Sequence, residues 1–191
     1  EPIKLIDLLN EAISRARKMV IEKKPDLAEE EVEKRAKVIG LGAVRYADLS
    51  QDRTLDYVFS WEKMLAMQGN TAPYLQYAVA RIHSIFRKAQ VSPTQILTTH
   101  YQPKTDSERS LARKFLFFPG VIKQTTKELK PHFLGCYLFE LATEFSSFYN
   151  QSKVMVEEEE IKTLRLILCA RSLVILQIGM DILGIETLEE M

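Results

Sequence analysis

The chain has few cysteines, no long apolar run and no excess of either charge. Both of its cysteines, Cys136 and Cys169, lie within apolar helical pattern, which predicts buried free thiols rather than a disulfide framework. The longest apolar candidate, Leu164 to Met180, is interrupted by charged and amide side chains, so it falls short of the roughly 20 residues that a membrane span needs. The chain opens Glu-Pro-Ile-Lys, without the basic and then apolar beginning of a signal peptide. Together these features predict a protein of a reducing, cytoplasmic setting with no membrane partner.

Motifs of the common catalytic and nucleotide-binding sites are absent or weak. The histidines His83, His100 and His132 are scattered and lack metal-ligand spacing with the cysteines. A Gly-x-Gly occurs once, at Gly40 and Gly42, but it lies within helical pattern, so helix packing explains it better than phosphate binding does. No Walker-type sequence and no Gly-x-Ser-x-Gly elbow is present. The residues alone therefore predict a helical binding module rather than an enzyme.

The net charge of zero hides an uneven distribution of charge along the chain. Residues 81–130 carry ten Lys/Arg and three Asp/Glu, a balance of +7, whereas residues 131–191 carry four basic and ten acidic residues, a balance of −6. A basic middle is compatible with nucleic-acid binding. The charged solvent-facing sides of long helices would give the same balance, so charge alone leaves both interpretations open.

Apolar residues recur at helical spacing along most of the chain, and no hairpin turn signal is present. A first helix is expected from Ile3 to Val20, and Asp26 with Glu29 predicts a capped start for a second helix that runs to about Tyr46. Further helices are expected at about 60–67, 71–86, 105–118, 121–130, 131–149 and 160–183, with a break at residues 119–120 and a stop at residue 184. Residues 48–60 are expected to be a loop or an extended segment, residues 90–105 are expected to be a loop, and the predicted fold class is all-α.

The segment Gly69-Asn-Thr-Ala-Pro-Tyr-Leu-Gln-Tyr-Ala-Val-Ala-Arg-Ile82 has unusual chemistry on one helix face. Tyr74, Tyr77 and Arg81 are three and four residues apart, so they share that face. Two tyrosines beside an arginine can stack single-stranded bases and contact phosphate, and the helix that carries them leads into the basic segment 81–130. The alternative, which spacing alone slightly favours, is a half-buried helix whose tyrosines pack with their hydroxyls outward.

The same segment resembles a signature of arginyl-tRNA synthetases, Gly-Asn-Thr-Ala-Pro-Tyr-Leu-Gln-Tyr-Ala-x-Ala-Arg-Ile, at nearly every position. Other segments resemble signatures of that family in the same order. They are Ile3 to Glu11, Gly40 to Leu49, Asp56 to Trp61, Pro131 to Leu141, Phe145 to Asn150, and Gly179 to Met191. The resemblance covers essentially the whole chain, which makes an accidental match implausible.

The resemblance implies a two-part fragment of a class I synthetase. Residues 1–70 would be the tail of the catalytic region, and residues 71–191 would be the helix-bundle anticodon-binding domain. The His-x-Gly-His and Lys-Met-Ser-Lys motifs are absent, so the fragment is expected to be inactive alone and to hold no cofactor. By resemblance, the parent would be a cytoplasmic monomer that joins arginine to its tRNA using ATP and magnesium. The expected partner of this part is the anticodon stem-loop of arginine tRNA.

Carried over to this sequence, the resemblance implies six residues that contact tRNA. The tyrosines would stack on bases, Met191 would supply apolar packing if the native chain ends there, and the others would make polar or phosphate contacts. The six residues are Asn70, Tyr74, Tyr77, Arg81, Tyr149 and Met191. The alternative is a standalone helical module that kept this fold and binds another RNA or a protein. The segment Ile3 to Glu11 argues against it, because a freestanding domain has no need for a catalytic-domain tail.

Overall fold

The protein is all-helical in the residues that its computed structural model describes, 4–56, 59–96 and 102–191. Within these ranges the chain forms nine helices, of which two are only four residues long. They are α1 (Leu5–Lys23), α2 (Glu29–Leu49), α3 (Trp61–Met64), α4 (Ala72–Ala89), α5 (Pro93–Ile96), α6 (Asp106–Phe115), α7 (Phe118–Glu128), α8 (His132–Gln151) and α9 (Glu159–Ile182). The predicted fold class is confirmed.

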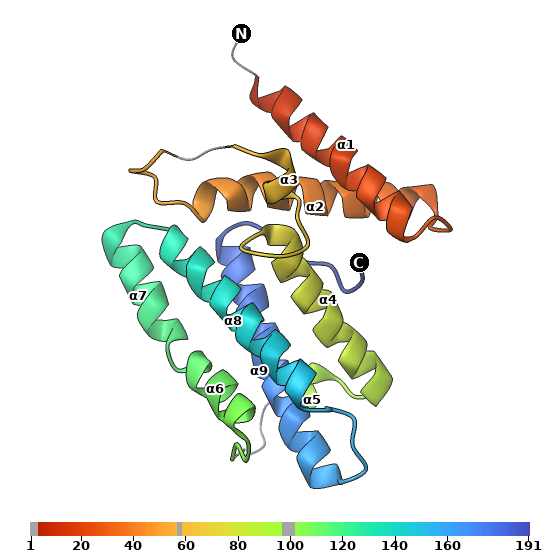
Figure 1. Ribbon diagram of the computed structural model, residues 1–191, viewed down its shortest axis with the longest axis vertical. Coiled ribbons are helices and arrows are strands. Elements are labelled where there is room, and N and C mark those ends of the chain that lie inside the picture. Colours follow the sequence, from red (N-terminus) through yellow and green to blue (C-terminus); the bar gives the residue numbers. More distant parts are fainter. Residues whose placement is uncertain (1–3, 57–58, 97–101) are drawn as a thin grey trace.

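A bundle built around α8 and α9 forms the larger part of the molecule, and α1 and α2 lie across one end of it (Figure 1). Helix α9 packs against α4, α5, α6 and α8. By length and composition alone α9 could cross a membrane, but more than half of its most apolar stretch is buried within the protein. A helix that is apolar on nearly every side suits this central position in a bundle.

Helices α1 and α2 approach each other closely because Gly40 has no side chain. An ideal Cβ at Gly40 would lie 2.8 Å from the backbone nitrogen of Ile13 and 2.9 Å from the carbonyl oxygen of Ala12. The predicted role of Gly40 in helix packing is therefore confirmed. Around this contact, Ala16, Ala36 and other buried residues of the two helices form a core of their own.

The pair of helices is joined to the bundle through a fully buried amide on α4. The Nε2 atom of Gln76 donates to the carbonyl oxygen of Val38 on α2 at 3.2 Å and to that of Glu186 after α9 at 2.9 Å. Gly42 lies against the same amide, where an ideal Cβ would be 2.9 Å from Nε2. Gln76 thus fixes α2, α4 and the segment after α9 relative to one another.

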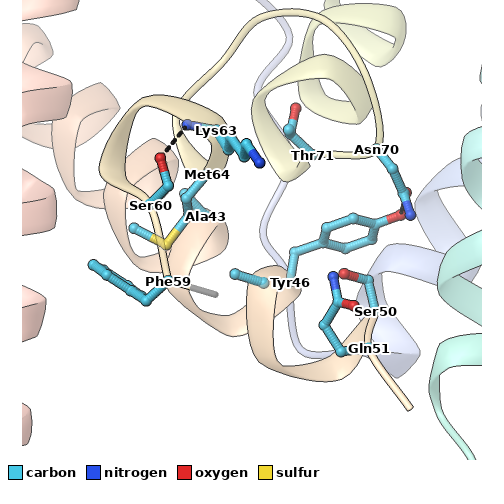
Figure 2. Close-up of a pocket in the computed structure, with 11 residues that line it drawn as sticks. Ala43, Tyr46, Ser50, Gln51, Phe59, Ser60, Lys63, Met64, Asn70 and Thr71 are labelled. Carbon is cyan, nitrogen blue, oxygen red and sulfur yellow. Dashed lines mark hydrogen bonds between the residues drawn. The ribbon is translucent and has the colours of Figure 1, made fainter. Parts of the chain in front are cut away.

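Tyr46 of α2 provides a second connection, to the start of α4 and to α8. Its side chain is buried, and its hydroxyl lies 2.5 Å from Oδ1 of Asn70 and 2.9 Å from the carbonyl oxygen of Gly135. Figure 2 shows the ring pointing toward Asn70. Burial raises the pKa of the Tyr46 phenol far above its ordinary value, so the group remains a hydrogen-bond donor.

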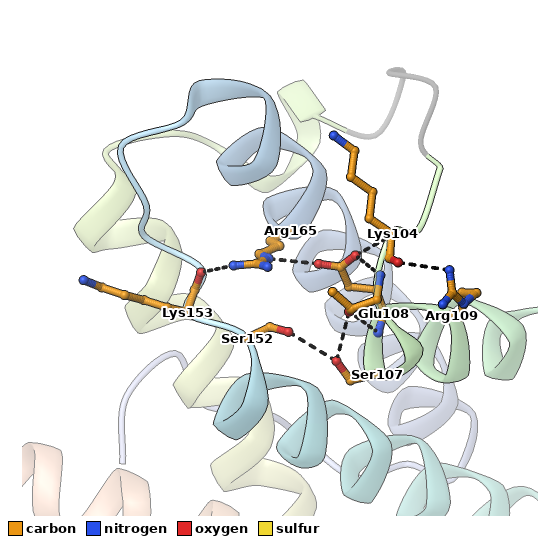
Figure 3. A network of polar contacts seen from close by, with 8 residues as sticks. Lys104, Ser107, Glu108, Arg109, Ser152, Lys153 and Arg165 are labelled. Atoms are coloured by element: carbon orange, nitrogen blue, oxygen red, sulfur yellow. Dashed lines mark hydrogen bonds and ion pairs between the residues drawn. The ribbon is translucent and has the colours of Figure 1, made fainter.

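A polar network fastens the start of α6 to α9 (Figure 3). Thr105 and Glu108 form a capping box, in which the Glu108 carboxylate accepts from the backbone N–H groups of Lys104 and Thr105 at 2.9 and 3.1 Å. Arg165 of α9 donates to the same carboxylate at 2.9 Å and to the carbonyl oxygen of Lys153 at 2.6 Å. Burial of the carboxyl opposes ionisation, but these hydrogen bonds outweigh it and hold the pKa of Glu108 below its ordinary value.

Some predicted helix boundaries were wrong, each for a local reason. Helix α6 ends at Phe115, and Pro119 and Gly120 lie in the first turn of α7 instead of separating two helices. Proline is well tolerated there because the first N–H groups of a helix have no intrahelical partner. Asp26 does not cap α2, which follows Ala28 without a side-chain cap. Helix α5 lies inside the segment that was predicted to be a loop.

One of the two cysteines was also misplaced by the sequence pattern. Cys169 is buried in α9 as predicted, and burial raises the pKa of its thiol, but Cys136 is exposed. Along α8, Cys136 shares the exposed side with Glu140 and Thr143, which follow at spacings of four and three. Ile3, where the first helix was expected to begin, and His100 lie outside the described residues.

Candidate nucleic-acid interface

Three of the six predicted contact residues form a cluster beside α4. Tyr77 and Arg81 lie one turn apart on α4, and Tyr149 lies near the end of α8. The guanidinium carbon of Arg81 is 4.7 Å from the centroid of the Tyr77 ring and 5.3 Å from that of Tyr149. Arg81 Nη2 also donates to the Tyr77 hydroxyl at 3.0 Å. Both rings thus lie within cation–π distance of one guanidinium.

A hollow of about 460 Å³ opens beside this cluster. Its walls come from the end of α1, from α4, from α8 and from the segment after α9. Besides the three clustered side chains, it is lined by two cations, Lys24 and Arg87, and by Glu190 and Met191. The structure therefore brings four of the predicted residues, which are far apart in the sequence, to one place.

The two tyrosines of α4 differ in their surroundings. Tyr77 is 37% exposed and lies between this hollow and a neighbouring one of about 350 Å³. Tyr74 is half-buried: its ring packs edge-on against Phe139, with centroids 5.8 Å apart, and its hydroxyl lies 3.3 Å from Oγ of Ser146. Tyr74 also lines the second hollow, but it is less exposed than Tyr77, so Tyr77 offers the more open ring for stacking.

Asn70 lies apart from the cluster. Its Oδ1 accepts from the Tyr46 hydroxyl, and it lines a different hollow, bounded by α2, α3 and the start of α4 (Figure 2). Because its acceptor oxygen already has a partner within the protein, Asn70 has a clear part in joining α2 to α4. Its contact with tRNA stays a prediction.

The basic residues of the middle segment do not form one groove. Arg81 and Arg87 lie on α4, whereas the basic residues of α6 and α7 lie across the bundle from α4 (Figure 1). Several basic residues in or next to α6 and α7 have acidic partners within the protein: Arg109 with Asp106 at 2.7 Å, Lys130 with Asp52 at 2.8 Å, and Lys104 with Glu160 at 3.3 Å. Among the described residues, Arg81 has no carboxylate within ion-pair distance. Its charge thus remains available to a ligand.

Sequence reasoning missed the other charged residues of the hollow. Ala80, Ser84 and Arg87 are four and three residues apart, so they share a face of α4 next to the face that carries the tyrosines. This spacing could have predicted that Arg87 lies near the site. Lys24 and Glu190 are brought in by contacts between distant parts of the chain, for which the sequence carries no local signal.

Comparisons with known proteins identify the family to which the chain is similar. Residues 75–191 match the family described as the DALR anticodon binding domain, and residues 1–61 match the class I tRNA synthetase (R) catalytic domain. The arginine–tRNA ligase of Escherichia fergusonii is 46% identical over 190 residues, which cover 99% of this chain and 33% of that relative. Among solved structures, arginyl-tRNA synthetase of Thermus thermophilus superposes with a TM-score of 0.87 at 32% identity, covering 99% of this chain and 32% of that one. The Plasmodium falciparum enzyme gives 0.89 at 31% identity, with coverage of 99% and 34%.

The relatives that the chain matches are longer than the chain itself. The chain spans about a third of the length of the curated relatives it matches. The two matched domains occur in the order that the resemblance implied, and the sequence similarity runs through both. The chain belongs to the arginyl-tRNA synthetase family, as the C-terminal region in which the end of the class I catalytic domain is followed by a DALR anticodon-binding domain.

Proposed function

We propose that this chain binds the anticodon stem-loop of arginine tRNA in the hollow beside α4, as the tRNA-binding part of an arginine–tRNA ligase. The observation that carries the proposal is the guanidinium of Arg81 held near the rings of Tyr77 and Tyr149 at the mouth of an open hollow. Anticodon nucleotides are unpaired, so their bases can stack on aromatic side chains and on guanidinium planes.

Each group in the hollow has a role that follows from its chemistry. The exposed ring of Tyr77 is a stacking surface, and the side chain of Met191 is an apolar wall next to it. Arg81, Arg87 and Lys24 are placed to contact the phosphates of the loop, which position the RNA without reading its sequence. Tyr149 holds Arg81 from the side of α8.

In this proposal the joining of arginine to tRNA belongs to a longer cytoplasmic monomer, in which residues 1–70 end the catalytic region and residues 71–191 form the tRNA-binding domain. We assign none of the chemistry of ATP and magnesium to these residues. The His-x-Gly-His and Lys-Met-Ser-Lys motifs are not in the sequence. In addition, the described part of the chain contains no group of three or more His, Cys, Asp or Glu side chains that could hold a metal ion.

The test is the affinity of the chain for arginine tRNA and for a non-cognate tRNA, each measured at several salt concentrations. We expect tighter binding of the arginine tRNA and a linear fall of log K with log salt, because phosphate contacts release counterions. Equal affinity for both tRNAs would contradict selection of the anticodon loop, and absence of binding would overturn the proposal.

The sequence of the gene upstream of Glu1 separates the proposal from a standalone module. A preceding His-x-Gly-His motif in the same reading frame supports the ligase. A start codon at that place supports a standalone helical module that binds another RNA or a protein.

A further inference from the structure

The last nine residues of the chain are held across the bundle by contacts from α2 and α4. Arg87 Nη1 donates to the carbonyl oxygen of Glu189 at 3.1 Å, and Gln76 Nε2 donates to that of Glu186 at 2.9 Å. Leu188 is buried against α1 and α2, and Met191 packs on the same apolar core. This segment, residues 183–191, thus has a defined course that ends beside Tyr77.

The carboxylate of Glu190 lies among three cations from different parts of the chain. It is 3.4 Å from Arg87 of α4, 3.8 Å from Arg35 of α2 and 3.9 Å from Lys24 after α1. These distances describe a charge cluster rather than three tight hydrogen bonds. Because the Glu190 side chain is itself half-exposed, no single pair in the cluster is strong, and its effect depends on the three cations together.

Arg35 is the partner for which the position of Glu190 matters most. Its side chain is buried, and its Nη1 has no hydrogen-bond partner within the protein. The carboxylates near its guanidinium are those of Glu31, at 3.3 Å, and Glu190. A buried cation is costly without a nearby acid, so Arg35 attracts Glu190 to this position and resists its departure.

Anchoring Glu190 also places the residue that follows it. Met191 lines the hollow beside Arg81 and, together with Tyr77 and Arg35, a smaller and largely apolar one on the side of α1 and α2. Since Glu190 and Met191 are consecutive, holding the carboxylate limits how far the methionine can move from the hollows that Tyr77 also lines.

We propose that Glu190 is a positioning residue of the RNA site, whose carboxylate fixes Met191 beside Tyr77 through Lys24, Arg35 and Arg87. The inference rests on the proposed function, because it concerns the same hollow. The two possible roles of Glu190 predict opposite effects on RNA affinity. If its carboxylate acts only by repelling bound phosphates, neutralising it should make the chain bind RNA more tightly. If it positions Met191, neutralising it should make the chain bind RNA less tightly.

The experiment compares the unchanged chain with Glu190→Gln and Glu189→Gln, using fluorescence anisotropy with an arginine tRNA anticodon stem-loop. The two variants remove the same charge one residue apart, but only the Glu190 side chain belongs to the cluster, since Glu189 is held through its backbone. We expect Glu190→Gln to weaken binding by about five- to tenfold, which corresponds to about 1–1.4 kcal/mol. Glu189→Gln should leave the affinity unchanged or slightly raised. Tighter or unaltered binding by Glu190→Gln would overturn the inference.

Two further variants separate positioning from a general loss of structure. In a Met191→Ala background, Glu190→Gln should cause no additional loss, because its effect passes through the methionine; an equal loss in both backgrounds contradicts this route. Glu190→Asp, which keeps the charge on a shorter side chain, should retain more affinity than Glu190→Gln, and circular dichroism confirms that each variant is folded. If the unchanged chain fails to bind, the proposed function falls as well; if it binds and Glu190→Gln matches it, only this inference falls.

Discussion

Arg81 keeps a fixed position without a neutralising partner. Its guanidinium is held by two aromatic rings and by the Tyr77 hydroxyl, none of which removes its charge. Arg109, by contrast, is paired with Asp106 at 2.7 Å, so much of its field is already compensated. A cation that is oriented but uncompensated can attract a phosphate at low entropic cost, since its side chain is already ordered.

Tyr77→Ala should weaken binding of the anticodon stem-loop by about 1–3 kcal/mol, the range for loss of one stacked base. The ring is exposed, so the fold should tolerate the change. Tyr77→Phe is the matched control, because it keeps the ring and removes only the hydroxyl that accepts from Arg81. Isothermal titration calorimetry gives both affinities. An unaltered affinity for Tyr77→Ala would return this residue to a packing role.

Arg81→Glu should weaken binding and lower the slope of log K against log salt by about one, because one phosphate contact is lost. Lys127→Glu makes the same change of charge at an exposed position of α7, across the bundle from α4, and should leave the slope nearly unchanged. Affinities measured between about 50 and 200 mM salt give both slopes. Parallel lines for Arg81→Glu and the unchanged chain would exclude a phosphate contact by Arg81.

Helical spacing predicted which residues share a face of α4, but not how deeply each is buried. Tyr74, Tyr77 and Arg81 do lie on one side, because periodicity fixes direction around a helix. That Tyr74 packs against Phe139 while Tyr77 is open depends on where α8 crosses, which is a long-range contact. The same limit explains why the bond from Tyr46 to Asn70 was not foreseen.

Two glycines in helices show how close packing between elements can override helix propensity. Gly40→Ala would place a methyl group within 3 Å of the α1 backbone, so α1 has to move away from α2. We expect a loss of about 1–3 kcal/mol in the free energy of unfolding, as for overpacked cores. Gly120→Ala in α7 is the control, because its Cβ meets nothing within 4 Å and tests propensity alone. Urea unfolding measures both; equal effects would show that α1 does not constrain residue 40.

The contact between Glu108 of α6 and Arg165 of α9 should make the free energy of unfolding depend on pH. The pKa of Glu108 is lower in the folded protein than in the unfolded chain, so its contribution is present above the unfolded pKa and is lost as pH falls through the folded pKa. Glu108→Gln should therefore reduce the free energy of unfolding by roughly 1.5–3 kcal/mol near neutral pH, the range for a hydrogen bond to a charged group.

The difference in free energy of unfolding between Glu108→Gln and the unchanged chain should shrink as pH falls through the lowered pKa of the folded carboxyl, where the group becomes protonated. Glu157→Gln alters an exposed acid in the loop before α9 and should change little at any pH. Denaturant unfolding at several pH values provides the comparison. A difference that stays constant with pH would mean that the ionised carboxylate of Glu108 does not stabilise the junction.

The helices and most of their boundaries follow from patterns within single segments, whereas the proposed site is assembled from four segments that only the whole fold brings together. Thr105 and Glu108 were recognised as a cap because all the atoms involved lie within four residues. Lys24 and Glu190 are 166 residues apart in the numbering, and their approach requires that α1 and α2 lie across the end of the bundle. No local rule contains that information.

Basic residues lie on two sides of the molecule, around the hollow beside α4 and on α6 and α7. Hydrogen exchange can decide which side binds RNA. If the anticodon loop binds in the hollow, amide protection should rise in residues 183–191 and near Tyr77, because these segments line it. In helix α7, across the bundle, amides that exchange through local opening should keep the same rate with and without RNA, whereas amides that exchange through global unfolding should slow throughout the chain. At a ligand concentration of 100 times Kd, binding adds about 2.7 kcal/mol to the apparent stability of the folded state. Protection confined to α6 and α7 would instead place the RNA on the other basic side, and the cluster around Arg81 would then be a contact between helices rather than a binding surface.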